Sequence, residues 1–303
     1  MISPAPVVIF AYNRPDHLKS LLISLSKNRG SSNSSVVVFL DGPKNDFDLF
    51  QQSKILDVLN GTFPFKSIEV RKSERNKGLA NSVRLGVTQM LSENSRVIVL
   101  EDDLVLSPFF LEYMNNALDF YESQTNVASI HGFQYPLKQT LSEPVFFRGA
   151  DCWGWATWRD RWDKVSFDSL DLSKKIEELD LIDSFNLRGS MDFYGLLLNQ
   201  SRGKVDSWAI CWHASMFLQN RLTLFPPKSL VQNHGNDGTG IHSGVNNLFE
   251  TKFAAEISWE YPVLVSESVV FKELLADFYK KSLNQSRFSV IKNKLFSIFG
   301  RSR

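Results

Sequence analysis

Short apolar runs alternate with segments of helical spacing along the first part of the chain. Runs rich in β-branched and aromatic residues, typical of strands buried on both faces, occur at residues 6–10, 36–40 and 96–100, and a shorter strand is expected at 67–70. Helices are expected after the turn at Pro15-Asp16, over Phe50–Leu59 and over Gly78–Leu91. This alternation predicts an α/β fold with a mostly parallel central sheet flanked by helices.

The pattern changes after residue 100. Ser107 and Pro108 suit an N-cap and a first helical position, and the apolar stripe behind them predicts a helix to about Tyr121. Beyond residue 125 the regular alternation gives way to mixed α+β structure. We therefore expect a first half over 1–125, a second half over 126–250 in the same domain, and a C-terminal helical extension over 251–303.

Polar clusters stand just after the predicted strands. They are Asn13-Arg14, Asp41, Arg75-Asn76 and Glu101-Asp102-Asp103. In parallel α/β sheets, ligands bind beyond the carboxyl ends of the strands. The clusters are therefore expected to converge on one ligand-binding edge.

Glu101-Asp102-Asp103 places three carboxylates at the end of a buried strand. Like charges this close raise one another's pKa and oppose burial, and a divalent cation relieves the repulsion. Carboxylate oxygens are the ligands that Mg²⁺ and Mn²⁺ prefer, and such ions commonly share substrate phosphates. A metal site is the favoured interpretation, and a solvated acidic turn is the alternative.

Composition narrows the classes of partner and compartment. The chain has 303 residues, 43% of them hydrophobic and 22% charged, with a formal net charge of +1, so no nucleic-acid partner is expected. Two cysteines, Cys152 and Cys211, make no disulfide framework and favour a reducing compartment. No signal peptide or membrane-spanning run is recognised, so a cytoplasmic location is expected.

The C-terminal end is basic and amphipathic. Residues 280–303 carry seven Lys or Arg and no acid, with apolar residues at helical spacing. Such a helix can lie on an anionic membrane, so residues 284–303 are expected to give peripheral contact with the inner face of the plasma membrane. A helix docked on the domain and a disordered tail are the alternatives.

Several motifs in a fixed order carry a family resemblance over about residues 6–245. They are PVVIFAYNRPDHL, VVVFLDGPK, RNKGLANSV, VIVLEDDLVLSPFFLEYM, GADCWGWATWRDRW, DSWAICWH and NHGNDGTGIH. With these the chain resembles the GT-A glycosyltransferases, specifically the bacterial family-2-like group related to N-acetylglucosaminyltransferase I. The resemblance implies a GT-A (nucleotide-diphospho-sugar transferase) fold. In it, residues 1–125 would bind the nucleotide sugar and residues 126–250 would form the acceptor half.

The resemblance also implies roles for individual residues. Asp103 would bind the metal, Mn²⁺ or Mg²⁺, and His242 would join it or contact the diphosphate. The donor-binding residues would be Asn13, Arg14, Asp41, Arg75, Asn76, Asn81, Glu101 and Asp102. For Asp41, a place in the Asp-Gly-Pro turn is the alternative. For Asn76 and Asn81, it is capping of a helix terminus.

Two further segments complete the implied site. Trp153, Gly154 and Trp155 would form a loop over the donor and acceptor sugars, or else belong to an aromatic core cluster. Asp206 would be the general base that takes the acceptor proton. Asp192 is its competitor, and capping of the following helix is the structural alternative for Asp206. Related sequences often carry a second acid where this chain has Ala209.

The implied enzyme is an inverting, metal-dependent hexosyl- or N-acetylhexosaminyltransferase. It would move a sugar from a nucleotide-diphosphate donor, with a UDP-sugar favoured, to a hydroxyl of a glycan or lipid-linked glycan acceptor. Bacterial surface polysaccharide or lipopolysaccharide synthesis is the expected setting. A nucleotidyltransferase is one alternative, although AYNRPDH lacks the usual Gly-rich phosphate loop. A non-catalytic nucleotide-sugar-binding protein is the other.

Overall fold

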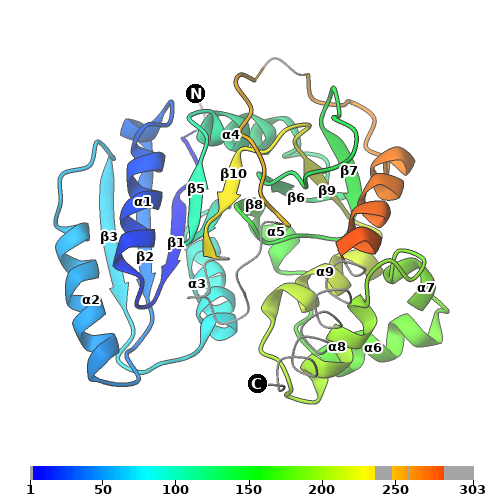
Figure 1. Cartoon of the computed structure of the whole chain (residues 1–303), viewed down its shortest axis with the longest axis horizontal. Helices are drawn as coiled ribbons and strands as arrows, with labels where there is room; N and C mark the ends of the chain where they lie inside the picture. Colours follow the sequence, from blue (N-terminus) through cyan, green and yellow to red (C-terminus); the bar gives the residue numbers. More distant parts are fainter. Residues whose placement is uncertain (1–2, 236–247, 258–259, 283–303) are drawn as a thin grey trace, which may run out of the picture.

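A large mixed sheet runs through both halves of the protein (Figure 1). The computed structural model describes residues 3–235, 248–257 and 260–282. The strands of the large sheet are β1 (Val7–Ala11), β2 (Ser35–Leu40), β3 (Ser67–Lys72), β4 (Arg96–Glu101), β6 (Val127–His131), β7 (Val145–Arg148), β8 (Trp155–Trp158) and β9 (Leu222–Phe225). Their order across the sheet is β3-β2-β1-β4-β8-β6-β9-β7.

The first half of the sheet is parallel, as predicted. β1 pairs with β2 and with β4 in parallel, and β2 pairs with β3 in the same sense. Beyond β4 the sheet is mixed, because β8 runs antiparallel to both β4 and β6, while β6 and β9 are parallel. The predicted α/β class, with a regular first half and a mixed second half, is therefore confirmed.

Helices cover both faces of the sheet. They are α1 (Pro15–Ser26), α2 (Asp46–Leu59), α3 (Leu79–Glu93), α4 (Phe110–Phe120), α5 (Arg159–Trp162), α6 (Ser169–Glu178), α7 (Ile182–Phe185), α8 (Phe193–Ser201) and α9 (Trp208–Leu218), with a 3₁₀ turn at Ser31–Asn33. Alternate residues of β1 divide between the two faces: Val7 and Ile9 pack with α1 and α4, whereas Val8 and Phe10 pack with α3 and α9. This alternation follows from the two-residue period of a strand.

Two helix starts differ from the prediction. α2 begins at Asp46 rather than Phe50, because the Asn45 side chain accepts a hydrogen bond from the backbone N–H of Asp48 and caps the helix earlier. α4 begins at Phe110 with Phe109 at the cap, so the expected capping by Ser107 is wrong. Ser107 and Pro108 instead belong to the turn that leads into the helix.

A small second sheet lies over the acidic tripeptide. β5 (Leu104–Leu106) pairs antiparallel with β10 (Val231–Asn233), with Asn233 opposite Leu104. This pairing brings residues from the far end of the domain beside Asp103. His234 and Gly235 therefore both contact Asp103, His234 through a backbone hydrogen bond and Gly235 by close approach to its carboxylate.

The C-terminal segment docks on the second half of the sheet. A helix over 269–282 lies beside β7 and β9, drawn in orange to red in Figure 1. Phe271 is fully buried, and the Tyr279 hydroxyl donates to that of Tyr135 at 2.9 Å. The expected basic helix over 284–303 lies outside the described residues. Among the helices of the described part, none has the length and apolar character needed to cross a membrane.

Candidate active site

The carboxyl ends of β1, β2 and β4 bring the predicted polar clusters together. Asp102 N donates to Phe10 O at 3.1 Å, and Asp41 N donates to Ala11 O at 3.1 Å. Glu101 stands opposite Phe10 in the register of β4 with β1. The predicted convergence on one edge of the sheet is confirmed for these acids.

Arg14 is the cation that faces the acidic tripeptide. Its Nη2 lies 3.1 Å from Asp103 Oδ2 and also donates to Asp102 Oδ1. Burial raises the pKa of Asp102, although the charge of Arg14 acts in the opposite direction. Burial and the charges of Asp103 and Asp102 raise the pKa of Glu101. Part of the charge compensation that the sequence assigned to a metal ion is therefore supplied by Arg14.

Asp103 keeps one carboxylate oxygen free of this ion pair. Its Oδ1 is buried and has no hydrogen-bond partner, whereas Oδ2 faces Arg14. His234 N donates to the backbone oxygen of Asp103 at 2.8 Å, and a β-carbon on Gly235 would stand 2.3 Å from Oδ2. The carboxylate is thus held in place with one oxygen available to a ligand.

This arrangement fits a metal ion that is shared with a substrate. The described residues contain no cluster of three or more His, Cys, Asp or Glu side chains that could hold a metal alone. Mg²⁺ and Mn²⁺ are commonly held by one or two carboxylates and completed by substrate phosphates and water. Asp103 Oδ1 suits that role. His242, the other expected ligand, lies outside the described residues.

Asp41 ties the loop before α3 to the sheet edge. Its Oδ1 accepts from the backbone N–H groups of Gly42 and Lys77, both at 2.9 Å, and its Oδ2 accepts from Gly78 N at 3.0 Å. A β-carbon on Gly42 would stand 2.3 Å from the Arg75 carbonyl carbon, so only glycine permits this close approach. Asp41 therefore bonds within its turn, through Gly42, and also holds the distant loop that carries the expected nucleotide-binding residues.

The asparagines of that loop also bond to backbone. Asn76 Nδ2 donates to Gly42 O at 2.8 Å, and Asn81 Nδ2 donates to Lys77 O at 3.0 Å. Arg75 and Asn81 are exposed. Neither asparagine caps α3, whose N-cap Gly78 has no side-chain cap hydrogen bond, so the capping alternative is wrong for both.

Asp48 was missed by the sequence reasoning. It is buried and accepts hydrogen bonds from the Tyr12 hydroxyl at 2.5 Å and from Asn13 Nδ2 at 2.7 Å. The signal was the Asn45-Asp46-Phe47-Asp48 start of α2, where an acid in the first turn is favoured by the helix dipole. Asn13, expected in the nucleotide pocket, is therefore oriented by Asp48.

Asp206 lies at the same edge, next to the start of α3. A β-carbon on Gly78 would stand 3.2 Å from Asp206 Oδ2, and Asp206 is exposed. The N-cap of α9 is Ser207, whose side chain accepts from Ile210 N, so the capping alternative for Asp206 is wrong. The competitor Asp192 does cap a helix, since its side chain accepts from Gly195 N at 2.9 Å.

The aromatic segment at the start of β8 makes packing contacts. Trp155 is 1% exposed and packs against Trp162, Trp208 and Trp212, with ring centroids 5.5 to 5.7 Å apart. It belongs to the core, as the sequence alternative allowed. Gly154 has a φ of 67°, and a β-carbon there would meet Val231 at 2.8 Å. Its close approach is to β10.

Trp153 is the half-buried member of this segment. Its ring packs edge-on against Phe133 at 4.8 Å and against Phe249 at 5.1 Å between ring centroids. Both contacts are aromatic, so the described structure gives Trp153 a packing role and leaves part of the ring exposed. A sugar contact through that exposed part stays a prediction.

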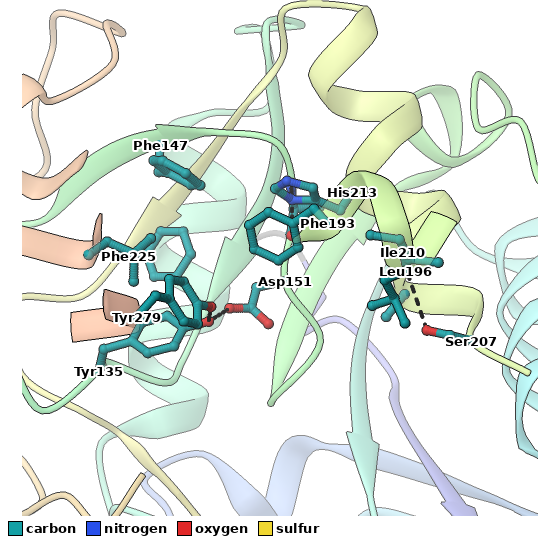
Figure 2. Close-up of a pocket in the computed structure, with 13 residues that line it drawn as sticks. Tyr135, Phe147, Asp151, Phe193, Leu196, Ser207, Ile210, His213, Phe225 and Tyr279 are labelled. Carbon is teal, nitrogen blue, oxygen red and sulfur yellow. Dashed lines mark hydrogen bonds between the residues drawn. The ribbon is translucent and has the colours of Figure 1, made fainter. Parts of the chain in front are cut away.

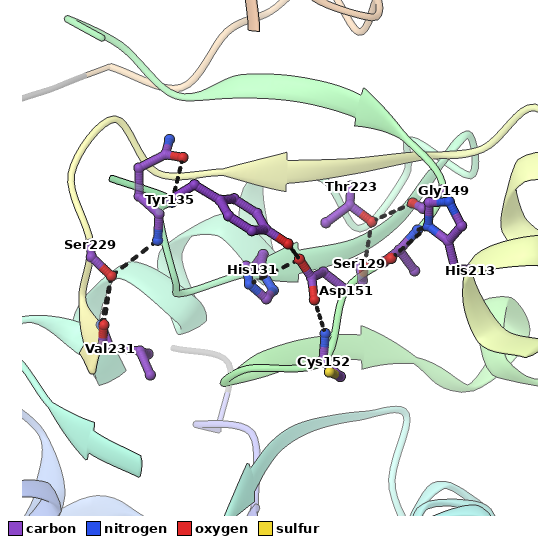
Figure 3. Close-up of polar contacts among 12 residues, drawn as sticks. Ser129, His131, Tyr135, Gly149, Asp151, Cys152, His213, Thr223, Ser229 and Val231 are labelled. Atoms are coloured by element: carbon purple, nitrogen blue, oxygen red, sulfur yellow. Dashed lines mark hydrogen bonds and ion pairs between the residues drawn. The ribbon is translucent and has the colours of Figure 1, made fainter. Parts of the chain in front are cut away.

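Asp151 is a second acid that the sequence reasoning missed. It accepts from the Tyr135 hydroxyl at 2.5 Å through Oδ2 and from Cys152 N at 2.7 Å through Oδ1 (Figure 3). The buried ring of His131 lies 3.9 Å away, and burial lowers the pKa of His131 to about 4. No sequence spacing links Asp151 to Tyr135, so only the fold could reveal this pair.

A family model places the chain among known proteins. The model for glycosyl transferase family 2 matches residues 7–189, which is more than half of the chain. The chain belongs to glycosyl transferase family 2. A comparison with curated proteins finds no match.

Solved structures from three organisms match parts of this chain. Residues 1–349 of TarS from S. aureus share 15% identity with this chain at a TM-score of 0.34, over 58% of this chain and 49% of that one. The mannosyltransferase PcManGT from Pyrobaculum calidifontis, in complex with GDP-Man and Mn²⁺, shares 16% at 0.34, over 45% and 39%. Glucosyl-3-phosphoglycerate synthase from Mycobacterium tuberculosis, in complex with Mn²⁺, UDP and glucosyl-3-phosphoglycerate, shares 14% at 0.36, over 59% and 67%. The chain spans about half the length of the TarS fragment, and TM-scores this low carry no functional argument.

Proposed function

We propose that the protein is an inverting, metal-dependent glycosyltransferase that moves a sugar from a nucleotide-diphosphate donor to a hydroxyl of a glycan acceptor. The observation that carries this proposal is Asp103 Oδ1, a buried carboxylate oxygen without a partner at the ligand edge of the sheet. Family membership supports glycosyl transfer over nucleotidyl transfer. The nearer relationship to N-acetylglucosaminyltransferase I stays a prediction.

The described residues support a distinct role for each acid at this edge of the sheet. Asp103 would hold Mn²⁺ or Mg²⁺, which neutralises the diphosphate leaving group when bound. Glu101 and Asp102 would face the ribose or donor sugar, and the loop held by Asp41 would face the nucleotide. Arg14 fixes Asp102 and Asp103, and it would also be the nearest side-chain cation to an incoming diphosphate.

Asp206 is the proposed general base. Its carboxylate is exposed beside Gly78 and takes no part in capping α9, so it is free to accept the proton of the acceptor hydroxyl. The hydroxyl oxygen then attacks the anomeric carbon while the nucleotide diphosphate leaves from the opposite face. This gives inversion in a single displacement.

Donor binding and turnover test the proposal together. Nucleotide sugars, beginning with UDP-sugars, would be screened by thermal shift with Mn²⁺ or Mg²⁺ and then assayed for nucleotide release with and without a chelator. We expect metal-dependent stabilisation and release in the wild type, and loss of both in Asp103→Asn. Tight nucleotide binding without turnover of any donor would indicate a binding protein instead, and activity in chelator would rule out the metal role.

The acceptor and the location are also proposed. We infer that the acceptor belongs to a bacterial surface polysaccharide or lipopolysaccharide precursor and that the enzyme works at the cytoplasmic face of the membrane. The basic character of residues 284–303 supports this location. Deleting these residues is expected to abolish sedimentation with anionic vesicles. Equal sedimentation of the truncated and full chains would contradict it.

A further inference from the structure

A pocket in the second half of the domain is walled by aromatic rings from that half and from the helix over 269–282 (Figure 2). It measures about 120 Å³, several times the ~30 Å³ that one water molecule takes up in the liquid. The rings that line it include Tyr135, Phe147, Phe193, Phe225 and Tyr279. Such walls suit the faces of a small ring better than an extended chain.

One carboxylate reaches into this pocket. Asp151 Oδ2 accepts from Tyr135 at 2.5 Å, and the Tyr135 hydroxyl itself accepts from Tyr279 at 2.9 Å. Asp151 Oδ1 accepts from Cys152 N at 2.7 Å. An ionised carboxylate has about four lone-pair positions, so Asp151 is fixed by two donors and retains capacity for a hydroxyl of a ligand.

The lining offers no positive charge. It contains no Lys or Arg among the described residues, and its one histidine, His213, is buried. Burial lowers the pKa of His213, so the imidazole is neutral at pH 7. A phosphate or carboxylate in this pocket would face Asp151 without a compensating cation, and like charges this close repel each other.

The lining places the pocket near the proposed general base. Ser207 lines the pocket and directly follows Asp206, which lies beside Gly78 at the edge of the sheet. Asp151 stands just before β8, and β8 pairs antiparallel with β4 with Trp155 opposite Val99, so the chain at Asp151 passes the carboxyl end of β4. A group in the pocket is therefore near the edge where the donor diphosphate is proposed to bind.

We propose that this pocket binds an uncharged sugar ring of the acceptor, with Asp151 accepting a hydrogen bond from a ring hydroxyl and the aromatic side chains packing on the ring faces. This inference rests on the proposed glycosyl transfer and adds the class of acceptor: a neutral sugar unit rather than a phosphorylated one. Tyr135 and Tyr279 act as positioning residues: the Tyr135 hydroxyl donates to Asp151, and the Tyr279 hydroxyl donates to that of Tyr135.

The test measures acceptor binding without the donor. Saturation-transfer NMR would compare methyl pyranosides with the same sugars carrying a 6-phosphate, at millimolar concentration, on the full chain. We expect the neutral glycosides to bind and the phosphates not to bind. Preference for the phosphates, or no binding by any neutral glycoside, would overturn the proposal, whether or not the protein turns over a nucleotide sugar.

Three variants locate the binding. Asp151→Asn is expected to weaken glycoside binding at least tenfold while leaving the thermal shift with nucleotide and Mn²⁺ unchanged. Tyr279→Phe removes only the outer hydroxyl and should have a smaller effect in the same direction. Tyr261→Phe is the matched control, because its hydroxyl also bonds within the fold, to Tyr113 O at 3.1 Å, but lies outside the pocket. If Asp151→Asn binds the glycosides as tightly as the wild type does, the role of Asp151 in this pocket is contradicted.

Discussion

Arg14 Nη2 lies 3.1 Å from Asp103 Oδ2, so the turn after β1 supplies the counter-ion for the acidic turn after β4. The same guanidinium bonds to Asp102, whose side chain is only 3% exposed. The sequence treats Arg14 as a residue that binds the donor. The structure shows that it also holds the acids in place.

Replacing Arg14 by glutamine is expected to destabilise the protein. The change leaves Asp102 buried without its counter-charge, and removing one partner of a buried ion pair costs about 3–5 kcal/mol. Urea denaturation at pH 7 measures the free energy of unfolding. Arg29→Gln is the control, since its pair with Glu112 is exposed and should be worth less than about 1 kcal/mol. If both variants lose the same free energy of unfolding, the Arg14–Asp102 ion pair contributes no more than an exposed pair.

Gly235→Ala is expected to reduce activity with little change in stability. A β-carbon there would stand 2.3 Å from Asp103 Oδ2, so the carboxylate must move away. A displacement of about 1 Å at a reacting site can cost roughly 100-fold in rate. Nucleotide release with Mn²⁺ should fall by about 10- to 100-fold, and thermal unfolding should be close to that of the wild type. Unchanged turnover would mean that the position of Asp103 is not critical.

Asp206→Asn is expected to abolish sugar transfer and preserve donor binding. Removal of a general base typically costs about 100- to 10,000-fold in rate. Asp192→Asn is the matched control, because Asp192 caps α8 and asparagine caps helices equally well. Transfer assays and nucleotide thermal shifts would be run on both. If Asp192→Asn loses transfer and Asp206→Asn does not, the two roles are reversed.

His131 is expected to make the fold sensitive to acid. Burial lowers its pKa from 6.5 to about 4 in the folded state, so the unfolded chain binds the proton more tightly. The stabilisation is complete above pH 6.5 and is lost as the pH falls toward 4. Between pH 7 and pH 5 this amounts to roughly 2 kcal/mol.

Urea denaturation at both pH values checks this contribution. His131→Phe should lose less stability on acidification than the wild type, by about that amount. Some loss of stability on acidification should remain in this variant because of His213, since burial also lowers the pKa of His213. His234→Gln, a change at an exposed imidazole, is the control. If the free energy of unfolding of His131→Phe depends on pH as strongly as that of the wild type, His131 is not the source of the acid sensitivity.

The sheet edge was predictable because it depends on local patterns. Each parallel strand is a short run of buried residues, and each is followed directly by its polar cluster, so the order along the chain fixes which groups meet at the carboxyl ends. Asp41 and Glu101–Asp103 were found in this way. Asp48 was missed because its partners, Tyr12 and Asn13, lie on another strand end, and a capping acid has an ordinary local explanation.

The sequence by itself therefore determined the α/β class, the parallel first half and the acidic edge, since strand periodicity and turn residues act over a few positions. Only the tertiary structure decided which charges and hydroxyls meet. Arg14 reaches Asp102 across 88 residues, and Tyr279 reaches Tyr135 across 144. Trp155 belongs to the core for the same reason: burial depends on how β8 packs against α5 and α9, and no local pattern encodes that contact.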